Sequence, residues 1–207
     1  MPRAAKRVTR LQPEGYLRER EYQDRARGAL AHLYPEVEVK TQWYPFAGEG
    51  LDIYAPVVDI AVGPFAIREK YGHRYTQQMV ETRPFVQGLI DLHNENVAAL
   101  DEKTDFDSLV EFNENARCLL CIEIEESGSR KHCLGNLVNA SALGRIGVLV
   151  ARTDKVLRIF VRQRAYLQFL AGVQKNTFKT ANALILSAAQ FDDCLRDHVA
   201  RLPANEL

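Results

Sequence analysis

The stretch CIEIE, residues 121–125, carries two carboxylates inside an otherwise apolar run. Successive side chains of a strand point to opposite faces, so Glu123 and Glu125 would share one face and the isoleucines the other. Burying two carboxylates together is costly unless a positive charge lies between them. A hard divalent ion suits such oxygen ligands, so the pair predicts a site for Mg²⁺ or Mn²⁺.

A third carboxylate would also be costly to bury. Asp59 lies in VVDIAV, residues 57–62, with apolar residues on both sides. If this strand is a neighbour of CIEIE, Asp59 converges with Glu123 and Glu125 on one metal site. A metal held there would lower the pKa of a bound water, with Glu125 as a further ligand or general base. Glu19, on a predicted N-terminal helix, is a candidate for an extra acid.

Two other interpretations stay open, one for the acids and one for the nearby cysteines. Alternating charge is common on the solvent face of an edge strand, which explains Glu125 easily and Asp59 poorly. The CLLC pair at 118–121, with His132 and Cys133 nearby, has the residue types of a zinc site. We expect this pair in a strand with its thiols on opposite faces, which favours buried core cysteines over zinc.

Hydrophobic periodicity predicts the elements that must position the acids. Together they predict an α/β fold, a mixed central sheet flanked by helices, with a mainly helical insertion at about 66–116. We expect a basic flexible tail over 1–13 and a single domain over 14–207. Helices are expected over 16–33, 131–144, 164–174 and 190–202, and strands over 36–44, 51–65, 117–125, 145–151, 155–162 and 181–188.

Composition limits the class of protein. The chain has 207 residues, 46% hydrophobic and 26% charged, as in ordinary soluble globular proteins. No apolar run reaches the ~20 residues that span a bilayer. The basic N-terminus has no apolar segment after it, and the four cysteines do not resemble a disulfide framework. We therefore expect a cytoplasmic protein that does not enter a membrane.

The formal net charge of zero conceals a segregation of charge along the chain. Residues 91–126 carry eleven acids and two bases, a net −9, and residues 127–181 carry ten bases and one acid, a net +9. This asymmetry is consistent with an anion-binding surface beside an acidic site, although solvated faces whose charges cancel in space are the more common reason for charge runs.

The acids and the elements around them resemble the PD-(D/E)xK nuclease superfamily. That pattern has an Asp at the end of one strand, Glu-x-Lys or Glu-x-Glu on the next, and then a helix packed across the sheet. The matching segments are APVVDIAVGP, CIEIEESGSRKH and LGNLVNASALG. The resemblance implies a restriction-endonuclease-like fold, with a core of a helix, three strands, a helix and a strand.

The resemblance implies metal-dependent hydrolysis of phosphodiester bonds by an endonuclease, in restriction, defence or DNA processing. Asp59 and Glu123 would hold Mg²⁺ or Mn²⁺. Glu125 stands where the family usually has lysine, so Lys131 is expected to supply that charge, with Arg130 as a weaker candidate. The alternative is a catalytically degenerate module of this fold that binds nucleic acid or a partner protein, which the missing lysine and the zero net charge favour.

The implied partner is nucleic acid, with DNA favoured over RNA, and members of this kind often form homodimers. Basic and amide side chains after CIEIE are the candidate contacts to phosphates or bases. These candidates are Arg130, Asn136, Asn139, Arg158, Arg162 and Arg164.

Overall fold

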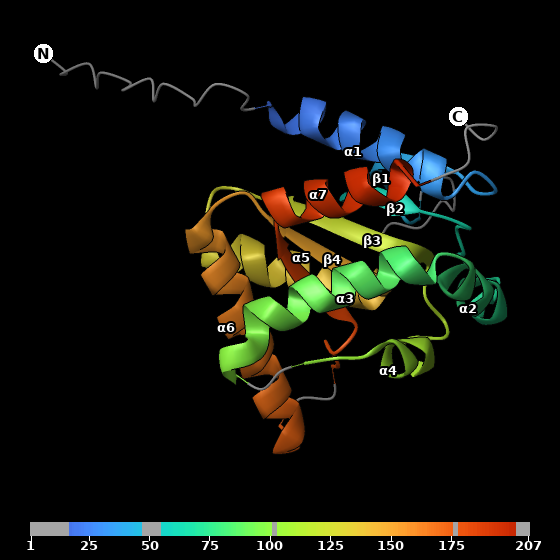
Figure 1. Ribbon diagram of the computed structural model, residues 1–207. Coiled ribbons are helices and arrows are strands. Elements are labelled where there is room, and N and C mark those ends of the chain that lie inside the picture. The colour runs from blue at the N-terminus through green and yellow to red at the C-terminus, as the bar shows by residue number, and fades with distance from the viewer. Residues whose placement is uncertain (1–16, 47–54, 101–102, 176–177, 202–207) are drawn as a thin grey trace, which may run out of the picture.

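The computed structural model describes residues 17–46, 55–100, 103–175 and 178–201, so the predicted tail over 1–13 lies outside the described residues. Helices and strands are interspersed along the chain, and strictly alternate only from β3 onward; the N-terminal helix comes first (Figure 1). The helices are α1 Glu19–Leu33, α2 Gly72–Glu81, α3 Arg83–Val97, η1 Ala98–Leu100, α4 Phe106–Glu111, α5 Arg130–Leu143, α6 Asp154–Gly172 and α7 Ala188–Val199. The strands are β1 Val39–Trp43, β2 Val58–Val62, β3 Cys118–Glu125, β4 Gly144–Ala151 and β5 Ala183–Ser187.

The five strands form one mixed sheet in the order β1-β2-β3-β4-β5. β2 runs antiparallel to both β1 and β3, whereas β3, β4 and β5 are parallel to one another. Parallel neighbours need a crossover of a dozen or more residues, and α5 and α6 supply the two crossovers. The predicted α/β class, a mixed central sheet flanked by helices, is confirmed.

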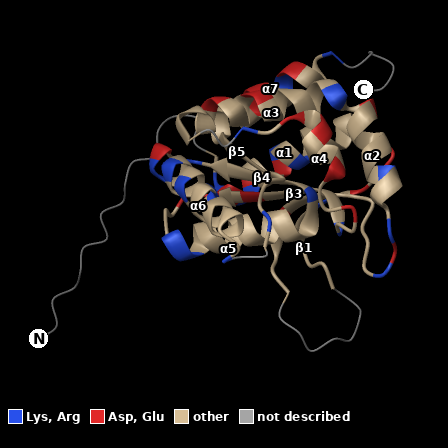
Figure 2. Cartoon of the chain, turned by 90° about the horizontal axis from the view of Figure 1, so that it is seen from below, with Lys and Arg blue, Asp and Glu red and all other residues tan. Residues whose placement is uncertain are grey.

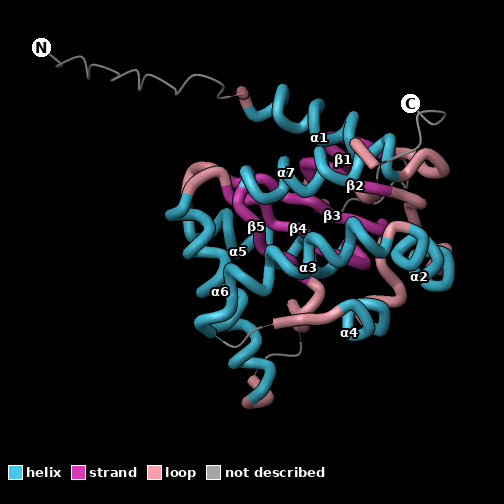
Figure 3. Tube along the Cα trace, viewed as in Figure 1, coloured by secondary structure: helices cyan, strands magenta, loops and turns pink. Residues whose placement is uncertain are grey.

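Helices cover both faces of the sheet (Figures 2 and 3). One core joins the sheet to α1, α3 and α7, and the other joins it to α5 and α6. Every residue of β3 and β4 is buried, because both strands have neighbours on each side and helices on each face. A Cβ on Gly147 of β4 would lie 2.8 Å from the backbone of Ala140, so glycine is required for α5 to pack this closely.

The segment between β2 and β3 is mainly helical, as predicted, and contains α2, α3, η1 and α4. This segment forms part of the core, because α3 packs against β5 and α7. Buried residues of α3 such as Phe85, Leu89 and His93 extend the core on that face. His93 accepts a hydrogen bond through Nδ1 from the backbone N–H of Ile185 in β5.

The strand predicted over 155–162 is wrong, because this stretch belongs to α6. Its apolar and β-branched residues fit a strand as well as a helix when spacing is ignored. The buried residues of α6 are Val156, Phe160 and Arg164, which recur at intervals of four and therefore mark one helix face. Thr153 caps the helix by accepting a hydrogen bond from Val156 N–H.

Among the residues that the structure describes, no helix is long and apolar enough to cross a membrane.

Candidate functional site

Asp59 and Glu123 meet where β2 and β3 separate. The last paired residues of the two strands at this end are Ile60 and Ile122. Beyond them, the Ile124 N–H donates to Asp59 Oδ2 at 2.7 Å, and the backbone N–H of Asp59 bonds to the Glu123 carboxylate. Each carboxylate thus accepts a hydrogen bond from a backbone N–H of the other strand, beyond the last paired residues. The predicted convergence of Asp59 and Glu123 is observed.

Glu123 is a buried acid with an unsatisfied oxygen. Its side chain is only 3% exposed, and Oε1 has no hydrogen-bond partner among the described residues. Burial, and then the neighbouring Asp59 carboxylate, raise the pKa of Glu123 well above its usual range. Hydrogen bonds from the Asp59 backbone and from the Asn139 side chain on α5 act in the opposite direction. Such a carboxylate is ionised only at a large energetic cost unless a cation joins it.

Asp59 is half-buried and held by two glutamines. Gln23 Nε2 on α1 donates to its Oδ1 at 3.0 Å, and Gln42 Nε2 on β1 donates to the same oxygen at 3.3 Å. Gln42 has a left-handed backbone, with φ of 49°, and also donates to Gln23 Oε1. Burial raises the pKa of Asp59 to about 6, and the charges of Glu19 and Glu125 add to this effect.

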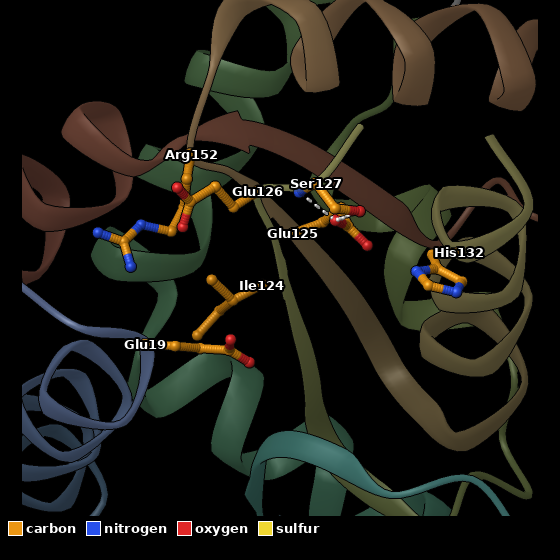
Figure 4. A pocket seen from close by; sticks show the side chains of 7 residues that line it. All are labelled: Glu19, Ile124, Glu125, Glu126, Ser127, His132 and Arg152. Carbon is orange, nitrogen blue, oxygen red and sulfur yellow. Dashed lines mark hydrogen bonds between the residues drawn. The ribbon is translucent and has the colours of Figure 1, made fainter. Parts of the chain in front are cut away.

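Glu125 lies on the same strand but has a different role. It is 8% exposed, and its Oε1 accepts from both the N–H and the hydroxyl of Ser127 at 2.6 Å (Figure 4). One oxygen of Glu125 therefore holds the turn after β3. Because β3 is the central strand and buries both glutamates, the interpretation that they line the solvent face of an edge strand is wrong.

A pocket of about 530 Å³ opens at the carboxyl end of β3, and it is lined by Glu125 but by neither Asp59 nor Glu123. Ligands of open α/β sheets typically bind at the carboxyl ends of the parallel strands. Figure 4 shows Glu19 and Arg152 on one side of the pocket and His132 on the opposite side. The lining residues are Glu19, Ile124, Glu125, Glu126, Ser127, His132 and Arg152.

The positive charge at the pocket comes from Arg152 and not from Lys131. Lys131 is exposed on the first turn of α5 and does not line the pocket. The Arg152 backbone N–H donates to the Glu125 carbonyl at 2.9 Å, and its Nη2 donates to the Leu17 carbonyl at 2.8 Å. Arg152 directly follows β4, and its place after a parallel strand was the sequence signal that could have identified it.

The other predicted nucleic-acid contacts divide into two groups. Arg130, Arg158 and Arg162 are exposed and line a second pocket of about 480 Å³. Asn139 instead bonds to Glu123, so it belongs to the carboxylate site, and Asn136 is half-buried on α5.

Arg164 was expected to continue the basic stripe, and this expectation is wrong. It is 1% exposed and donates to the Ala181 carbonyl at 3.4 Å. The helical course of α6 turns Arg164 toward the interior.

The four cysteines are free and buried, which agrees with the expected core role. Cys118 Sγ donates to the Leu143 carbonyl at 3.7 Å and Cys121 Sγ to the Asn139 carbonyl at 4.0 Å. Both thiols therefore face α5, and the expectation that they lie on opposite faces of the sheet is wrong.

Within the described ranges, no three His, Cys, Asp or Glu side chains are grouped so that they could hold a metal ion. The acid site thus offers the pair Asp59 and Glu123, not a complete protein cage. A pair suits Mg²⁺, which keeps several waters and commonly binds through one or two carboxylates and the substrate's phosphates. The unpartnered Oε1 of Glu123 provides a donor oxygen for such an ion.

In comparisons with protein-family models, with curated proteins and with solved structures, nothing matches this chain. The resemblance to the PD-(D/E)xK superfamily therefore rests on the residues and the order of the elements, and it stays a prediction.

Proposed function

We propose that this chain is a divalent-metal-dependent nuclease of the PD-(D/E)xK type that hydrolyses phosphodiester bonds, with DNA favoured over RNA. One observation carries the proposal. Asp59 and Glu123 come from neighbouring strands and meet directly behind the pocket residue Ile124, and each has a pKa raised by burial and by nearby acid groups. A bound Mg²⁺ or Mn²⁺ would remove this electrostatic cost and stabilise both charges.

The order of the elements supports the proposal. The series α1, β1, β2, β3, α5 and β4 is a helix, three strands, a helix and a strand, which is the core implied by the resemblance. The two acids occupy the positions that the resemblance assigns to metal ligands. The restriction-endonuclease-like fold, a homodimer and a cytoplasmic location remain predictions that accompany this proposal.

The surrounding residues suit the chemistry. Gln23 and Asn139 would orient the two ligand carboxylates, as outer-shell partners do in metal sites. A bound metal would supply Lewis acidity at the phosphate and a more acidic water. Arg152 would stabilise charge on the phosphate oxygens from the pocket wall. Glu125 has one oxygen held by Ser127 and the other available to accept a proton from water.

A second candidate function has an observation in its favour. Glu125 stands in the usual lysine position, and two hydrogen bonds of 2.6 Å commit its Oε1 to the turn. A glutamate used in this way contributes to structure more than to catalysis. The alternative is therefore a catalytically degenerate module of the same fold that binds nucleic acid or a partner protein.

An endonuclease assay separates the two functions. The full chain is incubated with supercoiled plasmid, single-stranded DNA and RNA, each with Mg²⁺, Mn²⁺ or EDTA. Glu123→Gln tests the site, and Glu111→Gln, at an exposed glutamate of α4, is the matched control. Cleavage that needs metal, persists in the control and disappears in Glu123→Gln supports the nuclease. Cleavage that is equal in both variants, or absent throughout, contradicts it.

A further inference from the structure

The exposed side of α6 carries an ordered stripe of basic and then aromatic residues. Its members recur every three or four positions, so they lie on one side of the helix. Tyr166 is 58% exposed, Phe169 is 64% exposed and Val173 is 46% exposed, and the basic members are exposed as well. The members of this α6 stripe are Lys155, Arg158, Arg162, Tyr166 and Phe169, with Val173 directly after the last residue of the helix.

The stripe is not needed to hold α6 on the sheet. The opposite side of the helix does that through Val156, Phe160 and Arg164, all of which are buried. Large apolar side chains exposed together on one helix are typical of a binding surface. The aromatic half of the stripe therefore points to a ligand with apolar faces.

The basic half of the stripe has more positive charge than nearby carboxylates neutralise. Lys155, Arg158 and Arg162 line the 480 Å³ pocket with Arg130 from the start of α5. No salt bridge joins any of these four cations to a carboxylate of the described residues. Arg158 and Arg162 lie one helical turn apart, where like charges repel. An anion bound in this pocket would relieve that repulsion.

The segregation of charge in the sequence places this surplus on one face of the sheet. The basic region 127–181, with net charge +9, supplies α5 and α6. The acidic region 91–126, with net charge −9, supplies part of α3, all of α4 and β3. Figure 2 shows Lys and Arg along α6, on the other side of the sheet from α3 and α7.

The stripe begins next to the carboxylate site. Gly128 has a φ of +67°, and a Cβ placed on it would lie 3.2 Å from both Cε and Nζ of Lys155. This glycine follows Ser127, which binds Glu125, so Lys155 lies just behind the turn that borders the pocket. At about 1.5 Å per residue, the stripe extends about 27 Å along the helix from Lys155 to Val173.

We propose that the α6 stripe binds single-stranded nucleic acid, with the basic half on the phosphates and Tyr166 and Phe169 stacked on unpaired bases. Single-strand binders combine a positive surface with aromatic side chains in this way. A duplex fits less well, because its base faces are hidden in the stack. A second copy of this chain fits less well too, because its own stripe carries the same positive charge.

The inference rests on the proposed function in one respect, since it makes a single strand the substrate that the carboxylate site would cleave. Binding itself does not depend on cleavage. It is measured by fluorescence anisotropy in EDTA, on the full chain, with labelled oligothymidylate, oligouridylate and a duplex of the same length.

Two double variants test the two halves of the stripe. Tyr166→Ala with Phe169→Ala should weaken single-strand binding about 5- to 150-fold for each base that loses its stacking partner, and should leave duplex binding unchanged. Its control is Tyr44→Ala, at an aromatic that is 55% exposed elsewhere. Arg158→Ala with Arg162→Ala should reduce the slope of log affinity against log salt by about 1.4, at about 0.7 per phosphate contact of a single strand.

A charge control, Lys70→Ala with Arg74→Ala, removes two exposed cations far from α6 in the chain. Because all the substituted side chains are exposed, circular dichroism and thermal unfolding should show each variant folded. Single-strand affinity that is unchanged in both stripe variants, or lowered equally by the controls, overturns the inference. Sedimentation that shows a wild-type dimer dissociated by the Tyr166 and Phe169 changes also overturns it, because the stripe would then be a self-interface.

The outcomes separate this inference from the proposed function. If the chain cleaves with metal but both stripe variants bind as wild type does, the inference alone fails. If the stripe variants lose single-strand binding as expected but no cleavage occurs in any condition, the nuclease alone fails.

Discussion

Replacing Asp59 by Asn removes a charge that the fold makes costly. Burial raises the pKa of Asp59 from its ordinary 3.8 to about 6, helped by the charges of Glu19 and Glu125. Between these pH values the folded protein holds a proton on Asp59 that the unfolded chain has lost. Stability therefore falls as the pH rises through this window, and the whole cost is present above about pH 6.

The size of the effect follows from the pKa difference. A shift from 3.8 to about 6 corresponds to at most about 3 kcal/mol, at 1.36 kcal/mol per pH unit. Asparagine preserves the shape of the site. Its oxygen can accept from the Ile124 N–H, and its amide can face Gln23 if the glutamine amide turns its oxygen toward it. In EDTA, the free energy of unfolding of Asp59→Asn relative to wild type should therefore rise by up to about 3 kcal/mol between about pH 4 and pH 8.

Urea unfolding at a series of pH values measures this difference. Glu123 titrates in both proteins, so the comparison cancels most of its contribution. Asp107→Asn, at an exposed aspartate of α4, is the control and should show a difference that does not change with pH. A difference for Asp59→Asn that is constant, or that falls with increasing pH, would refute the claim that this carboxylate is strained by its surroundings.

Four further changes test the supporting structure. Asn139→Ala removes a donor to the Glu123 carboxylate and should weaken Mn²⁺ binding about 10- to 100-fold in calorimetric titration. Ser127→Ala removes one of two hydrogen bonds to the last carboxylate of β3 and should lower stability by about 1 kcal/mol in urea unfolding. Gly128→Ala should cost about 1–2 kcal/mol, because φ is +67° and the new methyl group would press on a lysine side chain. Gly135→Ala, in α5 with nothing within 4 Å of its added Cβ, should instead stabilise by about 0.5–1 kcal/mol in the same measurement.

The acid site was predictable because charged side chains are costly to bury in apolar strands. Asp59 and Glu123 are carboxylates in apolar strands, and that energetic conflict is visible in the sequence itself. From the sequence, the pairing of the two strands was only a condition, and the structure shows it. The hydrogen bonds that cross between β2 and β3 could not be predicted, because they depend on where the two strands separate.

Other parts of the site were not predictable from local patterns. Asn139 reaches Glu123 from α5, which depends on tertiary packing, whereas the place of Arg152 directly after a parallel strand was a usable signal. The β-branched residues of 155–162 suit a strand, while the four-residue spacing of Val156 and Phe160 indicates the helix that the structure shows. Because this stretch is helical, Arg158 lies on the exposed side of α6 and not on a strand.

Mn²⁺ binding tests most directly whether Asp59 and Glu123 share a divalent cation. Isothermal titration of the full chain near pH 6, in two buffers with different ionisation enthalpies, reports both the ion and any protons that it displaces. We predict saturable binding with proton release, because burial raises the pKa of both acids, and loss of binding in Asp59→Asn and Glu123→Gln but not in Asp107→Asn. Binding that is equal in all four proteins, or absent from the wild type with and without nucleic acid, would contradict the account.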